Sequence, residues 1–278
     1  MRHLNLKVSI VITLILACSM FQLACEDSST DPEKAEQPVL PPAGTMSADL
    51  STFGGSSGVG KAATPVAVPA SQLNFGTAVV VATMVDATVL LGLSGPAFVL
   101  GQAVTSVPEL EDDNKYHWQY ESTYEYLKYS SDLAGWINLR TQQANWEMQV
   151  TQSTLNWDDF VWYDGHCDLD LSEGVWNFYQ TTTPDTMIET VTLNWEYASE
   201  TDRSLVFEIV KTGSGAIGDQ LTYAVDGDST RMEYYDASTG ITSKIVWNTE
   251  TTAGYIYMPD YNNGQLAYWD ENHQDVVP

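Results

Sequence analysis

From Lys115 onward the chain alternates between apolar and polar residues, and this alternation limits the possible folds more than any other feature of the sequence. Four segments show it clearly, at residues 146–150, 191–197, 205–209 and 244–248. Successive side chains of a β-strand point to opposite faces, so a period of two predicts a strand with one apolar face. We therefore expect each of these segments to be a strand.

Turn-forming residues separate the alternating segments. Strands that follow one another at intervals of about 8–12 residues, with no helical pattern between them, are typical of an antiparallel meander. We expect a mainly β fold, an up-and-down meander of about ten strands that forms a curled or barrel-like sheet. The turn signals are Asp164-Gly165, Glu173-Gly174, Asp226-Gly227, Ser238-Thr239-Gly240 and Asn263-Gly264.

Residues 73–104 differ from the rest and predict an N-terminal apolar helix at about residues 74–93. Ala78 to Leu93 contain Asp86 as their only charged residue, and Asn74 is a suitable N-cap. Gly95-Pro96 predicts a break, after which a second short helix can begin. The apolar stretch is shorter than the roughly 20 residues that span a hydrocarbon core. We expect this helix to pack on the concave face of the sheet, with a membrane segment as the alternative.

The first 25 residues have the layout of an export signal, in which Arg2 and Lys7 precede an apolar run at residues 8–16. Cys25 stands where the apolar sequence gives way to acidic and polar residues. It resembles the lipobox cysteine of bacterial lipoproteins, whose thiol takes a diacylglyceryl group. Cys18 has a better lipobox consensus before it and is the alternative lipidation site. The resemblance implies a lipid-anchored protein of the bacterial cell envelope, at the outer membrane or cell surface more than at the inner membrane.

Residues 26–72 are rich in proline, glycine and serine and begin with an acidic stretch, which predicts a flexible tether. Such a composition offers few side chains from which to build a core. The predicted organisation is therefore a lipoprotein signal peptide at residues 1–25, a tether at 26–72 and a single β-domain at 73–278 that begins with the apolar helix.

The charge and the cysteine content argue against a nucleic-acid partner and against a disulfide within the domain. The chain has 37 acidic and 11 basic residues, and removal of Arg2 and Lys7 with the signal leaves nine basic residues and a net charge of −28. A surface this negative repels phosphate backbones, so nucleic acid is not an expected partner. Cys167 is the single cysteine after residue 25, so we expect no intramolecular disulfide in the domain.

Short motifs that suggest catalysis or metal binding do not have the context that they need. Residues 54–62 nearly match a P-loop and a nucleophile elbow, but they lie in a tether-like segment, and Ala62 replaces the hydroxyl residue that holds Mg²⁺. Residues 168–174 alternate oxygen-bearing side chains without the EF-hand glycine. His166 and Cys167 are neighbours on a predicted strand and point to opposite faces. We predict no catalytic residue, no metal site and no cofactor.

Five short aromatic motifs occur in the β-region. They are Trp146-Glu147-Met148, Phe160–Gly165, Gly174–Tyr179, Ile245–Asn248 and Tyr268–Asn272. With these motifs, residues 73–278 loosely resemble a group of uncharacterised bacterial lipoproteins that have a β-domain rich in tryptophan and tyrosine. The resemblance implies export and a β-fold, and it brings no known reaction.

The aromatic residues are the best remaining indication of a binding site. All nine tryptophans follow residue 115, and most are expected to be core residues and cross-strand partners. A subset would line an apolar cavity or form a stacking platform for sugar rings. The candidate ligand-binding residues are Trp146, Trp162, Trp176, Trp195 and Trp247.

Three functional hypotheses follow. The first is a membrane-tethered, non-enzymatic lipoprotein that binds or carries a hydrophobic ligand such as a lipid. The second is an extracellular glycan-binding or adhesive module that uses exposed aromatic residues. The third, and least favoured, is a hydrolase that uses carboxylates such as Asp158 and Asp159, which diverge when they are adjacent on an extended segment. A cavity between helix and sheet favours the first hypothesis, and coplanar exposed tryptophans favour the second.

Overall fold

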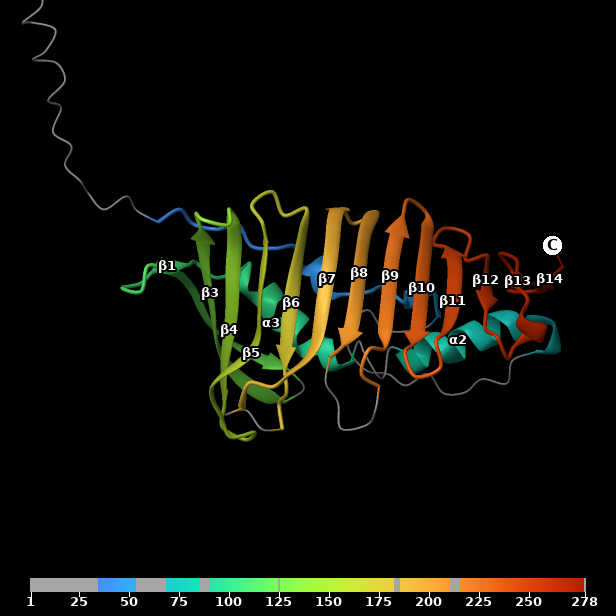
Figure 1. Ribbon diagram of the computed structural model, residues 1–278, viewed down its shortest axis with the longest axis horizontal. Helices are drawn as coiled ribbons and strands as arrows, with labels where there is room; N and C mark the ends of the chain where they lie inside the picture. Colours follow the sequence, from blue (N-terminus) through green and yellow to red (C-terminus); the bar gives the residue numbers. More distant parts are fainter. Residues whose placement is uncertain are drawn as a thin grey trace, which may run out of the picture. The chain divides into compact units, whose positions relative to one another are not determined.

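Fourteen antiparallel strands follow one another through a single sheet in chain order (Figure 1). Within the described part of the chain, β1 and β14 each pair with one neighbour, so the sheet is open. The contacts reported below lie within one unit, residues 36–278. The computed structural model describes residues 35–53, 69–85, 91–124, 126–182, 186–210 and 216–277.

The strands differ in length from two to twelve residues. They are β1 (Glu109–Leu110), β2 (Tyr116–Tyr124), β3 (Leu127–Asn138), β4 (Gln143–Gln152), β5 (Trp157–Asp168), β6 (Glu173–Tyr179), β7 (Glu189–Ser199), β8 (Asp202–Ile209), β9 (Gln220–Asp226), β10 (Ser229–Asp236), β11 (Ile241–Asn248), β12 (Gly254–Tyr257), β13 (Ala267–Trp269) and β14 (Asp275–Val276).

The predicted mainly β, antiparallel meander is confirmed, and the four clearly alternating segments lie in β4, β7, β8 and β11. The predicted number of about ten strands is too low. The additional strands include β1, β12, β13 and β14, which have two to four residues each. Such short strands contain too few residues for a period of two to be recognised.

One face of the sheet is buried and the other is polar. In β4 every second residue from Ala144 to Gln152 is buried, while the residues between them are partly exposed. The same alternation places Leu205 and Phe207 of β8 on the buried side. We call the side of the sheet that carries Trp146 the helix-side face and the opposite side the open face.

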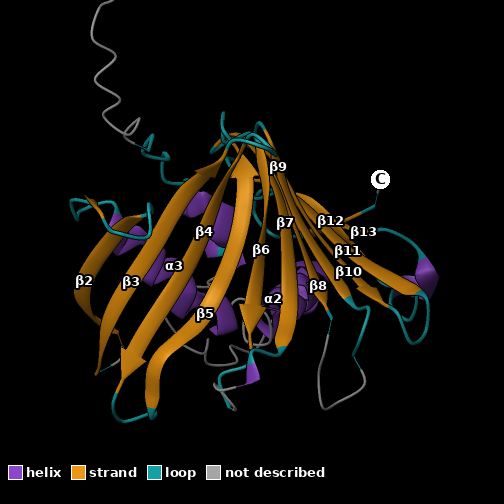
Figure 2. Ribbon diagram, turned by 60° about the vertical axis from the view of Figure 1, so that its left-hand side comes forward, coloured by secondary structure: helices purple, strands orange, loops and turns teal. Residues whose placement is uncertain are grey.

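Two helices, α2 (Leu73–Val85) and α3 (Leu91–Ala103), lie on the helix-side face (Figure 2). The helix predicted at residues 74–93 differs from the structure, in which α2 is described from Leu73 to Val85 and α3 from Leu91, while residues 86–90 lie outside the described residues. The two helices pack at opposite ends of the sheet, α2 against β12 to β14 and α3 against β2 and β3. Neither helix described here is long and apolar enough to cross a membrane.

The break predicted at Gly95-Pro96 is wrong, because both residues lie inside α3. Proline removes one helical hydrogen bond, which is why the pair reads as a helix terminator. A Cβ on Gly95 would lie 2.6 Å from Cη2 of Trp162, so the missing side chain lets α3 approach the sheet closely. Asn74, the predicted N-cap, is inside α2, where its side-chain amide donates to the Tyr268 carbonyl over 2.8 Å.

Residues 36–53 pack on the helix-side face, although their composition predicted a tether. This segment contains two 3₁₀ helices, η1 (Ala43–Met46) against α3 and β7, and η2 (Ser51–Phe53) against α2. Met46, Leu50 and Phe53 are buried. The segment therefore supplies core side chains between the two helices.

Glycines opposite tryptophans are a recurring feature of the helix-side face. Gly165 of β5 is paired with Trp146 on one side and with Trp176 on the other. A Cβ on Gly165 would lie 2.5 Å from the Trp176 ring, so the indole covers the strand where a side chain is missing. The turns predicted at Asp164-Gly165 and Glu173-Gly174 are therefore wrong, because these pairs lie within β5 and β6. Similar Trp–Gly pairs are Gly135 with Trp146, Gly174 with Trp195, and Gly254 with Trp269.

Candidate functional site

A cavity of about 310 Å³ lies on the helix-side face, between α3 and strands β5 to β10. We call it the helix-side cavity. Its volume is at the lower end of the roughly 300–1,000 Å³ that small-molecule sites occupy. Its apolar lining residues are Leu93, Pro96, Trp162, Phe178, Val191, Phe207, Ile209 and Leu221.

The position of the cavity follows from the way the helices are distributed. In the described part of the chain, α3 packs mainly on β2 and β3 and α2 packs on the far end of the sheet. At the cavity, the apolar faces of the central strands meet the first turns of α3, at Leu93 and Pro96, while η1 covers another part of β7. Pocket-lining residues come from six successive strands, with Trp162 on β5 and Tyr234 on β10 at the two ends of the series.

One side of the helix-side cavity is polar and contains a buried carboxylate. Asp219, which directly precedes β9, is 5% exposed. Its carboxylate accepts a hydrogen bond from the Tyr234 hydroxyl and another, over 3.0 Å, from the backbone N–H of Ala237. Burial and the hydrogen bond to Asp219 raise the pKa of Tyr234 to about 12, so the phenol is protonated and acts as a donor at neutral pH.

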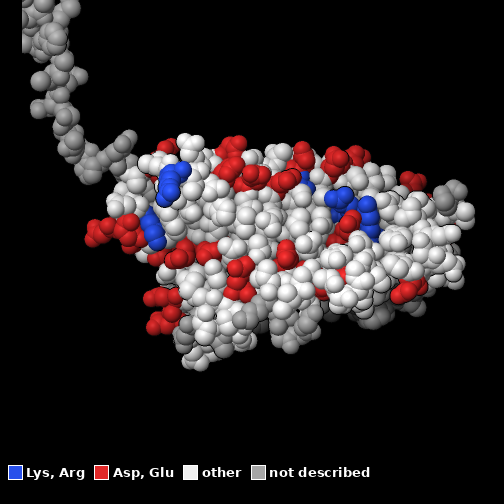
Figure 3. Space-filling view, in the orientation of Figure 1, with Lys and Arg blue, Asp and Glu red and all other residues white. Residues whose placement is uncertain are grey.

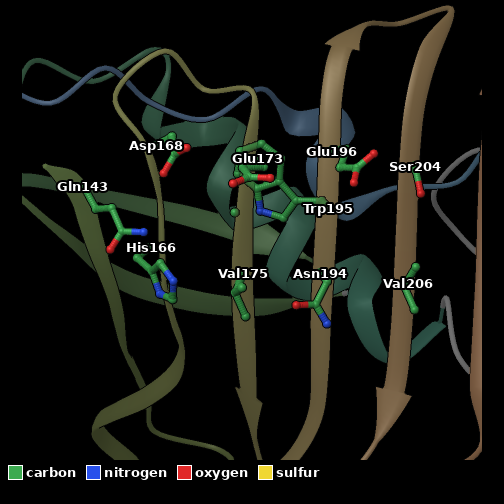
Figure 4. A pocket seen from close by; sticks show the side chains of 11 residues that line it. Gln143, His166, Asp168, Glu173, Val175, Asn194, Trp195, Glu196, Ser204 and Val206 are labelled. Atoms are coloured by element: carbon green, nitrogen blue, oxygen red, sulfur yellow. The ribbon is translucent and has the colours of Figure 1, made fainter. Parts of the chain in front are cut away.

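A second hollow, of about 340 Å³, lies on the open face over β4 to β8. Figure 4 shows His166, Val175, Asn194 and Val206 projecting from neighbouring strands into this open-face hollow, with carboxylates above them. Figure 3 shows the same side of the sheet, where acidic side chains far outnumber basic ones. Among the described residues, no three histidine, cysteine or acidic side chains are grouped so that they could hold a metal ion.

His166 and Cys167 do not form a catalytic pair. His166 lines the open-face hollow, whereas Cys167 is buried on the helix-side face. Burial raises the pKa of the Cys167 thiol to about 11, so it is not a thiolate at neutral pH. Asp158 and Asp159 are exposed, and Asp159 exchanges hydrogen bonds with Thr151 of the adjacent strand. These hydrogen bonds join the two strands of the β4–β5 hairpin.

The five candidate tryptophans are all buried, and the structure does not bring them together in one site. Trp162 lines the helix-side cavity, and Trp195 borders the open-face hollow. Trp146 and Trp176 cover Gly135 and Gly165, while the ring of Trp247 meets Phe53 edge-on with centroids 4.8 Å apart. Cys18 and Cys25, the candidate lipidation residues, lie outside the described residues.

The sequence analysis did not predict the α3 residues that line the helix-side cavity or its buried carboxylate. Leu93 and Pro96 were interpreted as the end of one helix and the start of another, and Asp219 carries no local motif. The one available signal was the run of apolar residues that alternate in β8 and β9. No known protein family model matches the chain, and no curated protein sequence matches it.

Proposed function

We propose that the chain is an exported lipoprotein of the bacterial envelope, held to the membrane by a lipid on Cys25, and that it binds an apolar ligand without catalysing a reaction. The helix-side cavity is the observation that carries this proposal. Eight apolar side chains line it, and it is large enough for a small hydrophobic molecule. The anchor would keep such a binding site close to a bilayer, where apolar molecules are abundant.

The positions of the tryptophans favour a hydrophobic ligand over a glycan. A sugar-binding platform needs exposed aromatic rings, and eight of the nine tryptophans are buried. Trp136 is partly exposed, but the Lys115 ammonium covers its ring at 4.4 Å. The open-face hollow has polar walls over Val175 and Val206, and the tryptophan that borders it, Trp195, is buried.

Uncharged N-phenyl-1-naphthylamine, which fluoresces more strongly in apolar sites, is expected to bind to residues 36–278. Val191→Phe fills the helix-side cavity and is expected to weaken binding at least about tenfold, or about 1.4 kcal/mol. Fluorescence titration measures both dissociation constants. Val206→Phe, a matched change in the open-face hollow, is the control and is expected to leave the affinity unchanged. Absence of binding to the wild-type domain, or an equal loss in both variants, contradicts the proposal.

The anchor has its own test. Cys25→Ser in the full-length chain is expected to abolish incorporation of labelled palmitate and to move the protein from the membrane fraction to the soluble fraction. Cys18→Ser is the matched control and is expected to retain the label. If the control loses the label and Cys25→Ser keeps it, Cys18 is the lipidated residue. If both variants keep the label, neither cysteine is the anchor.

A further inference from the structure

The buried carboxylate of Asp219 places a charged group in the wall of the helix-side cavity, which the binding of a purely apolar ligand does not require. Asp219 lines the cavity beside Tyr234 and is 5% exposed. Burying a carboxylate costs free energy unless hydrogen bonds or an opposite charge compensate it. A ligand that enters this cavity therefore meets a negative group at one side and the eight apolar side chains of the lining elsewhere, interrupted by Gln180, Thr181 and Thr190.

The described partners of Asp219 are neutral and leave acceptor capacity unused. Its two oxygens receive one hydrogen bond each, from the Tyr234 hydroxyl and from the Ala237 N–H. A carboxylate has about four lone-pair sites, so it can accept further bonds. Among the described residues, no lysine, arginine or histidine lines the cavity and none forms an ion pair with Asp219.

The geometry points to a ligand class: we infer that the helix-side cavity takes a single-chain apolar molecule whose polar end is a protonated amine or a hydroxyl, and that it rejects carboxylates and phosphates. This inference rests on the proposed function and names the ligand class of the same site. A donor head would bind the free acceptor positions of Asp219 while its chain contacts Trp162 and Phe207. An anionic head would lie beside a like charge in an apolar site, which costs several kcal/mol.

Competition among three ligands of equal chain length tests the inference. Decylamine, decanol and decanoate, each below its aggregation concentration, displace N-phenyl-1-naphthylamine from the protein at neutral pH. Decylamine is expected to displace the probe at a concentration at least about tenfold lower than decanoate, with decanol between them. Equal displacement by the three ligands would overturn the inference and leave the proposed function standing. Failure of the probe to bind the wild-type protein removes the proposed function itself.

Two variants separate the effect of Asp219 from the general negative charge. Asp219→Asn is expected to reduce the ratio of decanoate to decylamine concentrations to near one, with both concentrations corrected for the probe affinity of that variant. Glu208→Gln removes the same charge from the neighbouring open face, where Glu208 accepts a hydrogen bond from Gln220, and is expected to keep the ratio. Tyr234→Phe removes one donor from Asp219 and is expected to increase the ratio. A ratio that falls equally in Asp219→Asn and Glu208→Gln would assign the preference to surface charge and overturn the inference.

Discussion

A chain that begins at residue 54 is expected to be largely unfolded under conditions in which a chain that begins at residue 36 is folded. The deleted segment buries Met46, Leu50 and Phe53 against the sheet. Truncating a single large core side chain costs about 2–5 kcal/mol, and whole domains are stable by only about 5–15 kcal/mol. Circular dichroism with thermal and urea unfolding measures the difference between the two chains.

Specific hydrogen bonds add to this loss. The buried guanidinium of Arg203 donates to the carbonyl of Gly44 over 2.7 Å and to that of Ser47 over 3.2 Å. The indole of Trp176 donates to the Thr45 hydroxyl over 3.3 Å. Deletion removes these acceptors from both buried donors, which is costly, and Arg203 keeps its 3.7 Å ion pair with Glu200. Equal unfolding midpoints for the two chains would mean that residues 36–53 are a tether after all.

Gly165→Ala is expected to destabilise the domain by about 3 kcal/mol, the upper end of the usual cost of overpacking. The added methyl group would lie 2.2 Å from the carbonyl oxygen of Val175 and 2.5 Å from the Trp176 ring. Both obstacles are fixed, because one is strand backbone and the other is a buried indole. Urea unfolding measures the change in the free energy of unfolding.

Gly101→Ala is the control for this substitution. Gly101 lies in α3, and a Cβ added there has no neighbour within 4 Å. Alanine favours helix over glycine by about 1 kcal/mol, so this variant is expected to be as stable as the wild type or more stable. If Gly165→Ala unfolds at the same urea concentration as the wild type, the close approach of Trp176 to the glycine is not a feature of the folded protein.

The strands were predictable because their signal is local. Alternation of apolar and polar residues follows from the geometry of one strand, and in β4, β7, β8 and β11 it is long enough to be recognised. The turn at Asp226-Gly227 was also predictable, since Gly227 has a φ of +58° in the hairpin between β9 and β10. Asp164-Gly165 has nearly the same sequence as Asp226-Gly227, but Gly165 lies within a strand and pairs with tryptophans on the two neighbouring strands. No local sequence pattern indicates this pairing.

The packing of residues 36–53 and the helix-side cavity could not be predicted, because both depend on contacts between segments that are distant in the sequence. Residues 36–53 have the composition of a linker, yet Met46, Leu50 and Phe53 occupy gaps between α2, α3 and the sheet. Of the helix-side cavity, only Trp162 was a predicted site residue, because the cavity combines α3 with six successive strands that lie far from α3 in the sequence. Asp219 is one of 37 acidic residues, and only its burial beside Tyr234 distinguishes it.

The most direct test of ligand binding in the helix-side cavity is the NMR signal of the Trp162 indole N–H during titration with N-phenyl-1-naphthylamine. Trp162→Phe assigns this signal, and Trp136, on the open face, provides the reference. We predict that the Trp162 signal shifts in a saturable way, with the dissociation constant obtained from fluorescence, while the Trp136 signal stays in place. A Trp162 signal that does not move while the probe is bound, or a saturable shift at Trp136 alone, would contradict ligand binding in the helix-side cavity.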